Sequence, residues 1–397
     1  MLDLLPRKTL FNLPDDVIYL DGNSLGPLPA AVPERVANVI SKQWGTQLIR
    51  GWNESQWMEL PGRIGDTIAT LIGAKKGTVV MGDTLSIKVY QALCAALKMN
   101  PGRRVILSDA GNFPTDLYMA QGLIELLDKG YSLKLVEPHE VMQSIDESIA
   151  VVMLTQVDYR TGRLHDMQAI TSATHAAGAI SIWDLAHSAG ALPIQLDECE
   201  CEYAVGCTYK YLNGGPGAPA FIYVRPDLIS SSAPSLAGWL GHESPFAFDK
   251  SYTPAQSIER MRVGTPPVLQ LAALEAALGV WEGIDLASIR EASIRLSQLF
   301  IAEVEARCPE LRLASPREPE LRGSQVSFSF DRGYAVVQAL IAHNVIGDFR
   351  APDIMRFGFT PLYLEDADII VAVDRLEKIL KQKIWAQPEF QVRKAVT

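Results

Sequence analysis

The stretch AVGCTYKYLNGGPGAPAF, residues 204–221, places a lysine where an apolar run ends and a glycine cluster begins. Lysine side chains are strongly hydrated, so a lysine at the end of a buried strand costs free energy unless it has a use. Lys210 stands between two tyrosines at this point. The stretch therefore predicts a strand that ends at a functional lysine.

The segments around this lysine alternate between two patterns from about residue 78 to residue 225. Short runs rich in Val, Ile and Leu are typical of buried strands, and the longer segments between them have helical spacing. We predict strands in RRVILSD, YSLKLVE, IAVVMLT, AISIWD, YAVGCT and AFIYVR, and helices with Gly at the C-cap in FPTDLYMAQGLIELLDKG and DMQAITSATHAAG. This alternation indicates a mostly parallel sheet wrapped by helices, with ligands near the carboxyl ends of the strands.

The pattern changes at Thr265. The segment TPPVLQLAALEAALGVWEGI, residues 265–284, predicts a long linking helix that begins at prolines. Beyond it, GSQVSFSF, YAVVQALIAH, IMRFGF and DADIIVAVDRLEKILKQK predict a smaller α+β domain. Because 397 residues exceed the size at which one hydrophobic core stops growing, we expect more than one domain. The expected parts are an N-terminal arm and helix packing with the small domain (1–50), a large domain (51–265), and a linking helix with the small domain (266–397).

The composition indicates which classes of ligand the protein binds and in which compartment it works. No apolar run reaches the roughly 18 residues of a membrane span, and the net charge of -10 disfavours nucleic acid and anionic membranes as partners. A small molecule is the expected partner. The N-terminus lacks the features of a secretory signal, and five cysteines without a disulfide rhythm suit a reducing compartment, so we expect a cytoplasmic protein. Cys199 and Cys201 have no second ligand pair nearby, so no metal is expected.

Three polar residues follow neighbouring predicted strands. Asp184 closes AISIWD, His187 lies in the turn after it, and Lys210 follows the next strand, so all three should project into one crevice. A buried acid and a lysine near a common ligand is the arrangement that pyridoxal phosphate needs, with the lysine forming a Schiff base and the acid keeping the pyridine nitrogen protonated. Each residue also has a purely structural explanation, as a turn cap, a core histidine or a lysine reaching solvent. Their shared placement favours the cofactor site.

A phosphate site is expected in MGDTLSIKVYQAL. Asp83, Thr84 and Ser86 follow an apolar strand and open a helix, whose unpaired amides and positive dipole end attract a phosphate. The same residues would equally make an ordinary N-cap. The GGPG after Lys210 matches neither the dinucleotide fingerprint nor the Walker loop, and it indicates close backbone packing around the lysine turn.

Six motifs together resemble the kynureninase family over nearly the whole chain. They are YLDGNSLGPLP (19–29), NFPTDLY (112–118), WDLAHSAGALP (183–193), GCTYKYLNGGPG (206–217), GWLGH (238–242) and IMRFGFTPLY (354–363). The resemblance implies a homodimeric pyridoxal-phosphate hydrolase of the aspartate-aminotransferase fold type (fold type I), an α/β fold whose large domain holds a mostly parallel seven-stranded sheet. Such an enzyme hydrolyses L-kynurenine to anthranilate and L-alanine in tryptophan catabolism and NAD biosynthesis. The preference between kynurenine and 3-hydroxy-L-kynurenine, which would give 3-hydroxyanthranilate, stays open.

The resemblance also implies roles for single residues. Lys210 would form the Schiff base, Asp184 would pair with the pyridinium, and Tyr209 is the candidate acid for the β-carbon of the substrate. The implied cofactor contacts, besides these three, are Thr84, Leu85, Phe113, Asp116, Thr155, His187, Trp239 and Thr265. Trp239 and Thr265 would come from the partner subunit, so the dimer would share its active sites. Thr265 stands where some family members carry Asn.

Two further residues are implied to bind substrate. Arg356 in IMRFGF would hold the α-carboxylate, because a planar guanidinium fixes a carboxylate with two bonds. The alternative is that Arg356 only pairs with an acid such as Asp353. Trp52 in RGWNES would pack against the aromatic ring of the substrate or serve as a core anchor.

Two other functions share some of these features. A cysteine desulfurase or selenocysteine lyase of the same fold type uses the same lysine and acid, but it needs a thiol on a mobile loop of the small domain. Cys308, which follows a helix in EARCPELRLASP, is a poor candidate for that thiol. A noncatalytic cofactor-binding protein is the other alternative, and the presence of Lys210, Asp184 and Arg356 argues against it.

Overall fold

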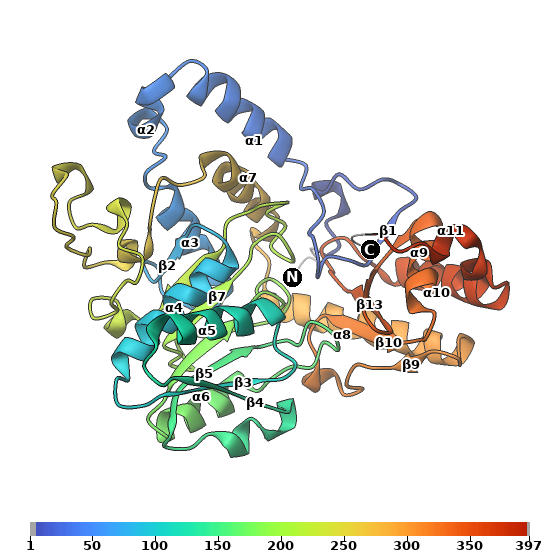
Figure 1. Ribbon diagram of the computed structural model, residues 1–397. Coiled ribbons are helices and arrows are strands. Elements are labelled where there is room, and N and C mark those ends of the chain that lie inside the picture. The colour runs from blue at the N-terminus through green and yellow to red at the C-terminus, as the bar shows by residue number, and fades with distance from the viewer. Residues whose placement is uncertain (1–4, 395–397) are drawn as a thin grey trace.

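A seven-stranded sheet forms the centre of the computed structural model, which describes residues 5–394 (Figure 1). β8 runs antiparallel to both of its neighbours, and the other strands pair in parallel. The six strands predicted from the sequence are confirmed, and the fold is the expected α/β class. In order across the sheet the strands are β2 (Val79–Met81), β8 (Phe221–Val224), β7 (Tyr203–Gly206), β6 (Ile180–Asp184), β5 (Ile149–Thr155), β3 (Val105–Asp109) and β4 (Ser132–Val136).

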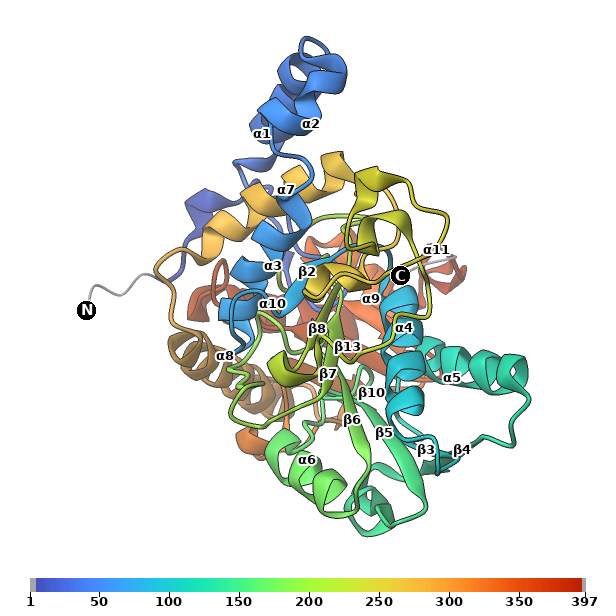
Figure 2. The same ribbon diagram turned by 90° about the vertical axis from the view of Figure 1, so that its left-hand side faces the viewer.

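Helices cover both faces of this sheet. Figure 2 shows α4 (Leu85–Met99) and α5 (Pro114–Leu127) on one side, and α6 (Met167–Ala176) with α8 (Leu286–Arg307) on the other. Successive side chains of a strand point to opposite faces, so Val151 of β5 lies in the core on the α4 side and Val152 lies in the core on the α6 and α8 side. Both faces of the central strand β5 are buried, and for this reason its sequence is apolar almost throughout, whereas the edge strand β4 is partly exposed and contains Lys134.

The predicted glycine caps are correct for one helix and wrong for the other. After α6, Gly178 adopts a left-handed φ of +71°. After α5, the left-handed residue is Asp128, with a φ of +46°, two positions before Gly130. Aspartate reaches this conformation more readily than most residues because its short polar side chain can form local hydrogen bonds.

The predicted linking helix is shorter than expected. α7 (Val268–Leu278) begins after Pro267 as predicted, but it gives way to a 3-10 turn at Gly279. Glycine is a weak helix former, and Gly283 then adopts a φ of +71°, which ends the helical path. The chain continues into α8, a helix of 22 residues that the sequence reasoning missed.

The C-terminal part forms a second, antiparallel sheet, seen at the right of Figure 1. Its segments match the predicted α+β pattern. The strand order is β12 (Asp348–Arg350), β13 (Ile354–Gly358), β10 (Gln325–Ser329) and β9 (Arg312–Leu313), and the helices are α9 (Gly333–Ala342), α10 (Asp366–Lys381) and the short α11 (Pro388–Gln391).

The N-terminal segment joins this second sheet region before it reaches the first. β1 (Ile18–Tyr19) pairs in parallel with β11 (Val345–Ile346). The chain then forms α1 (Val32–Asn38), a π-helical turn (Val39–Trp44) and α2 (Gly51–Glu54), which project from the body in Figure 2, before α3 (Leu60–Leu71) packs beside β2.

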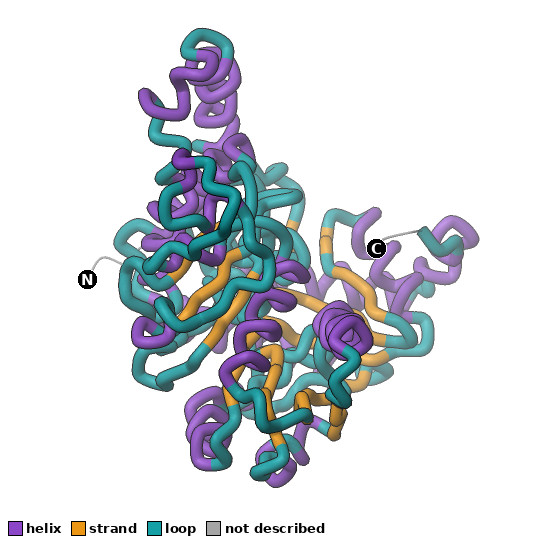
Figure 3. The backbone as a smooth tube through the Cα atoms, turned by 60° about the vertical axis from the view of Figure 1, so that its left-hand side comes forward, coloured by secondary structure: helices purple, strands orange, loops and turns teal. Residues whose placement is uncertain are grey.

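Between β8 and α7 the chain runs through loops and short 3-10 turns over residues 225–267, which lie at the left of Figure 1. Figure 3, in which this side of the molecule comes forward, shows how much of the backbone there is loop. No helix within residues 5–394 is long and apolar enough to cross a bilayer.

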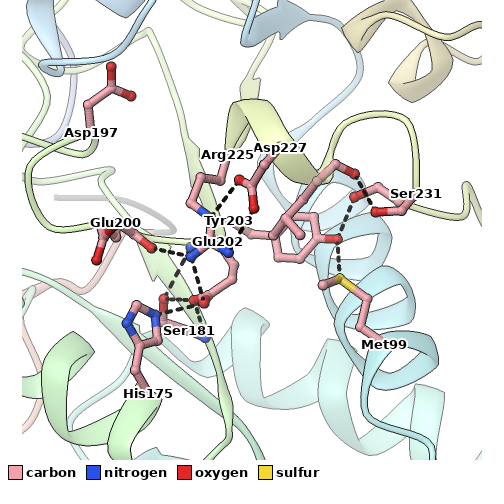
Figure 4. A network of polar contacts seen from close by, with 12 residues as sticks. Met99, His175, Ser181, Asp197, Glu200, Glu202, Tyr203, Arg225, Asp227 and Ser231 are labelled. Atoms are coloured by element: carbon pink, nitrogen blue, oxygen red, sulfur yellow. Dashed lines mark hydrogen bonds and ion pairs between the residues drawn. The ribbon is translucent and has the colours of Figure 1, made fainter.

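A polar network fixes the amino ends of two strands, opposite the edge where ligands are expected (Figure 4). Glu202, which is buried, accepts hydrogen bonds from the backbone N and the Oγ of Ser181 at 3.0 and 2.5 Å. His175 Nε2 and Arg225 Nη1 lie 2.7 and 3.2 Å from its other oxygen. Partners surround this buried carboxylate, as a buried charge requires, so we assign the network a structural role.

Candidate active site

The carboxyl ends of β5, β6 and β7 and the turns after them bring four predicted site residues together. Thr155 and Asp184 end neighbouring strands and are paired across them, and Asp184 is also paired with Val205 of β7. The chain reaches Lys210 a few residues beyond β7, where Lys210 Nζ lies 2.9 Å from His187 Nε2. Asp184 and His187 are buried, whereas Lys210 is half-buried and therefore open to a ligand.

The N-terminal arm presses on the lysine turn. Gly26 of the YLDGNSLGPLP motif donates its backbone N–H to the carbonyl oxygen of Tyr209 at 2.7 Å. A Cβ on Gly26 would lie only 2.4 Å from the carbonyl oxygen of Lys210. Only glycine allows this approach, so the motif places the arm against the lysine.

The start of α5 supplies a second wall of the site. Phe113 is the N-cap residue of α5, and Asp116 lies buried in its first turn. Asn112, which sequence reasoning missed, accepts hydrogen bonds from the Phe113 backbone N at 2.7 Å and from Thr155 Oγ1 at 2.5 Å. It thereby joins the α5 turn to the end of β5. Its position just before a helix start was the available signal.

Asp116 and Asp184 form a buried acidic pair. Burial, and then the charge of Asp184, raise the pKa of Asp116 well above its ordinary value. Burial also raises the pKa of Asp184, against the opposing charge of Lys210. Neither oxygen of Asp116 has a hydrogen-bond partner among the described residues. A cationic ring nitrogen would relieve the electrostatic cost of this pair, so the two acids fit the pyridinium of pyridoxal phosphate.

His187 is held in its neutral form. Burial, followed by the positive charges of Lys210, Arg356 and Arg350, lowers the pKa of His187 well below its ordinary value. Its Nδ1 is buried and has no hydrogen-bond partner within the described chain. A neutral imidazole beside Lys210 can lie flat against an aromatic ring, so His187 also fits a pyridine cofactor.

The first turn of α4 matches the expected phosphate site. Gly82 and Asp83 turn the chain with φ values of +152° and +56°, and Thr84 and Leu85 then begin the helix. Within the described chain, the Thr84 side chain does not cap the helix, so the first amides stay open to an anion. Lys88, fully buried one turn later, donates to Met261 O at 3.2 Å, and burial lowers the pKa of this lysine to about 8. The turn fits a phosphate group.

The other predicted contacts, Trp239, Thr265 and Trp52, are gathered less closely around the site within a single chain. Trp239 is 42% exposed and stacks edge-on against Phe246, and the exposed Thr265 lines a small cleft with Gly82 and Asp83. Trp52 packs edge-on against Trp57, with ring centroids 5.4 Å apart, in a small cluster that also contains Val39 of the π-helical turn and residues of α7. This contact matches the core-anchor alternative for Trp52 within a single chain.

Tyr209 lies beside Lys210 and retains its proton. Its ring centroid is 5.8 Å from Lys210 Nζ. The charge of Cys207 and burial together raise the pKa of the Tyr209 hydroxyl. A phenol that stays protonated at neutral pH can serve as a proton donor.

Arg356 is buried and pairs with an acid other than the one considered from the sequence. Arg356 Nε donates to Asp348 Oδ1 at 2.6 Å, and Nη2 contacts Asp348 Oδ2. The other donors reach the carbonyl oxygen of Tyr159 and the hydroxyl of Ser24, at 2.5 and 2.9 Å. The partner named in the alternative reading, Asp353, is therefore replaced by Asp348, which lies directly opposite Arg356 across the β12–β13 pair.

Asp21 adds a titratable group to this cluster. Burial, and then the charge of Asp348, raise the pKa of Asp21 to about 7. Because the folded pKa is raised, the group's contribution to stability is fully present below pH 4 and is lost as the pH rises through 7. Ionising Asp21 therefore destabilises the fold at alkaline pH.

We expect Asp21→Asn to flatten the pH dependence of stability. Between pH 4 and pH 8 the wild-type protein should lose about 3 to 4 kcal/mol more unfolding free energy than the variant, since one pKa unit corresponds to about 1.4 kcal/mol. Urea unfolding of both proteins at several pH values measures this difference. Parallel pH curves for the two proteins would contradict the raised pKa.

Comparisons with known proteins agree with this arrangement. The family model described as the kynureninase C-terminal domain matches residues 289–376. The kynureninase of Pseudomonas fluorescens is 52% identical over 401 residues, covering 99% of this chain and 96% of the relative. That of Burkholderia pseudomallei (strain 1106a) is 48% identical with the same coverage.

Solved structures of other enzymes share the fold. An apo cysteine desulfurase from Thermococcus onnurineus NA1 has a TM-score of 0.79 at 20% identity, covering 95% of this chain and 98% of that chain. A C-DES variant with glycine linked to its PLP cofactor has a TM-score of 0.78 at 18% identity, covering 94% of this chain and 99% of that chain. At this level of identity the likeness concerns the fold alone.

Proposed function

The chain belongs to the kynureninase family, and we propose that it hydrolyses L-kynurenine to anthranilate and L-alanine with pyridoxal phosphate held at Lys210. Cleavage of kynurenine and dependence on the cofactor follow from the family. The observation that carries the assignment to this site is the 2.9 Å contact of the half-buried Lys210 with His187, beside the buried acids Asp184 and Asp116.

Each part of the cofactor has a residue suited to it. Lys210 would hold it covalently through Nζ, and Asp184 would face the ring nitrogen, with Asp116 beside it. Phe113 and His187 would flank the ring, near Thr155. The phosphate would lie on the amides of Thr84 and Leu85, with Tyr209, Trp239 and Thr265 as further contacts. When bound, pyridoxal phosphate accepts electrons from the bonds broken at the substrate's Cα and Cβ.

The protein's own groups move the protons and orient the substrate. Lys210 Nζ would also act as the base that removes the Cα proton of the substrate. Tyr209, which keeps its proton, would donate to the β-carbon after anthranilate leaves. Arg356 would hold the α-carboxylate and so direct the Cα proton toward Lys210.

A homodimer is the expected working form. The chain exposes large apolar side chains on two segments, the arm around α1 and α2 and the loop before α7, and such patches mark interaction sites. They include Trp44 (58%), Ile49 (76%), Phe246 (64%) and Phe248 (76%). A second copy covering them would also bring Trp239 and Thr265 to its partner's site.

The remaining assignments extend the family assignment. We place the reaction in tryptophan catabolism in the cytoplasm. We also retain the proposed division into an arm (1–50), a large domain (51–265) and a small domain (266–397). The pairing of β1 with β11 supports an arm that packs with the small domain.

The test of function is direct. Purified protein with pyridoxal phosphate should release anthranilate from L-kynurenine, which is followed by its fluorescence. The same protein should not release sulfide from L-cysteine under reducing conditions. The one small-domain cysteine, Cys308, is buried, and burial raises the pKa of its thiol to about 12, which suits a sulfur acceptor poorly. Release of sulfide without anthranilate would favour a desulfurase.

Arg356→Ala should lower kcat/KM for kynurenine by on the order of a hundredfold, because the carboxylate loses its charged partner. It should also lower the melting temperature, since Asp348 is left buried without its main partner. Arg356→Lys should recover only part of kcat/KM, because an ammonium cannot reproduce the guanidinium's bonds. Visible absorption of the bound cofactor should persist in both variants. Unchanged kcat/KM in Arg356→Ala would remove Arg356 from the substrate site.

A further inference from the structure

One face of the β12–β13 hairpin carries a cluster of charges. Asp348 of β12 lies directly opposite Arg356 of β13. Arg350, two residues after Asp348, points to the same face because side chains alternate along a strand. The intervening Phe349 and the facing Met355 belong to the hydrophobic core on the other side. The fold therefore presents two arginines and one aspartate together.

Arg356 has little capacity left for a ligand. A guanidinium carries five N–H donors, and the described contacts use four of them: two on Asp348, one on Ser24 and one on Tyr159. A carboxylate held by two parallel bonds needs two donors. Arg356 alone therefore offers a single bond to a substrate carboxylate while its described contacts persist.

Arg350 supplies the missing donors at the same place. Its Nη2 lies 2.8 Å from Asp348 Oδ2, the oxygen that Arg356 Nη2 also contacts. Its Nη1 donates to the carbonyl oxygen of Phe349 at 2.9 Å, so three of its five donors remain free of described contacts. The Arg350 side chain is 35% exposed, whereas that of Arg356 is 2% exposed.

The net charge of the cluster favours the binding of an anion. Although burial opposes it, the hydrogen bond and charge of Arg356 and the charge of Arg350 hold the pKa of Asp348 below its ordinary value, so Asp348 is ionised. Two arginines then face one ionised aspartate, with Asp21 close to half-protonated at neutral pH. Both arginines also lower the pKa of His187, which contacts Lys210. Contacts connect the cluster to Lys210: Arg356 donates to the carbonyl oxygen of Tyr159, the Tyr159 ring packs edge-on against Phe113, and Lys210 Nζ lies 6.0 Å from the centroid of the Phe113 ring.

We propose that Arg350 is a second substrate-binding residue, which donates to the α-carboxylate of the amino-acid substrate alongside Arg356, while Asp348 holds both guanidinium groups in place. This role rests on the proposed function, since the carboxylate is that of kynurenine. Arg356 then contributes the buried, fixed bond and Arg350 contributes the accessible one.

The test compares ligands that differ only in the carboxylate. L-Alanine carries the α-carboxylate and ethylamine lacks it, and the visible absorption of the holoenzyme reports the dissociation constant of each. In Arg350→Met we expect about 10- to 100-fold weaker binding of L-alanine, as loss of a charge-assisted hydrogen bond produces. Ethylamine binding should change by less than about twofold. Arg295→Met is the matched control, because Arg295 pairs with Asp366 on the surface; it should leave both constants unchanged.

Further variants and outcomes keep the test decisive. Arg350→Lys retains the charge next to Asp348 and should weaken L-alanine binding less than Arg350→Met does, which decides the matter if the methionine variant does not fold. If Arg350→Met weakens the binding of L-alanine and of ethylamine equally, or weakens the binding of neither, the proposal is overturned. If the wild-type protein releases anthranilate in that case, the proposed function stands. If it releases none, the proposed function fails whatever the Arg350 variants bind.

Discussion

Lys210→Ala should lower kcat for kynurenine by on the order of ten-thousandfold or more, because the group that holds the cofactor and moves the Cα proton is removed. In the wild-type holoenzyme, borohydride should fix the cofactor covalently, and peptide mapping should place it on Lys210. The contact of Lys210 with the neutral His187, beside the Asp184 and Asp116 pair, motivates this expectation.

The peptide map could instead place the reduced cofactor on a different lysine. Lys88 is fully buried, unlike the half-buried Lys210, and burial lowers its pKa to about 8, so the Lys88 amine is partly uncharged near neutral pH. Reduced cofactor on Lys88 would contradict the assignment of Lys210. Lys129→Ala, at an exposed position after α5, is the control and should retain wild-type kcat and visible absorption.

Asp184→Asn should lower kcat by on the order of a hundredfold or more, as the loss of a major electrostatic stabiliser does in other enzymes. The amide keeps the shape of the side chain and can still accept the hydrogen bond from Ala186 N, so the fold should persist. What disappears is the negative charge that, in the proposed site, would keep the ring nitrogen of the cofactor protonated. Stopped-flow spectra with kynurenine, together with steady-state turnover, measure this loss.

The control for Asp184→Asn is the same substitution at Asp128. The Asp128 side chain is exposed, and its backbone has the left-handed conformation. Asparagine also adopts this conformation readily, so kcat should not change in Asp128→Asn. Near-normal turnover in Asp184→Asn would mean that another acid faces the ring nitrogen, and Asp116 would then be the next candidate.

The parts of the fold predicted from sequence are those that local patterns determine. Several strands between β3 and β8, such as β5 and β8, are apolar on both faces, which the sequence shows directly. α8 was missed although Asp285 caps it and Ile289, Leu296, Phe300 and Val304 recur at helical spacing. That signal was present in the sequence and was overlooked. The early end of α7 depends on Gly279 and Gly283, which weaken a helix without forbidding it.

The partners of site residues were harder to predict because they depend on pairing register. Asp353 is closer to Arg356 in sequence than Asp348, yet Asp353 lies in the connection before β13, while Asp348 lies opposite Arg356. Register between two short strands cannot be deduced from composition. Ser24 reaches Arg356 across 332 positions of the chain, and such a contact follows only from the complete fold.

The parallel pairing of β1 with β11 also constrains how the protein is made. Ile18 pairs with Val345, so 327 more residues (345 minus 18) must be translated after Ile18 before its partner exists. At about 5–20 residues per second, the first strand waits roughly 16–65 s on the ribosome without its partner. Ser24 and Asp21 lie just after that strand, and Arg356 lies just beyond its partner. The proposed pocket for the substrate carboxylate is therefore completed only after nearly the whole polypeptide has been synthesised, and nascent chains should remain unable to recognise an amino acid until then.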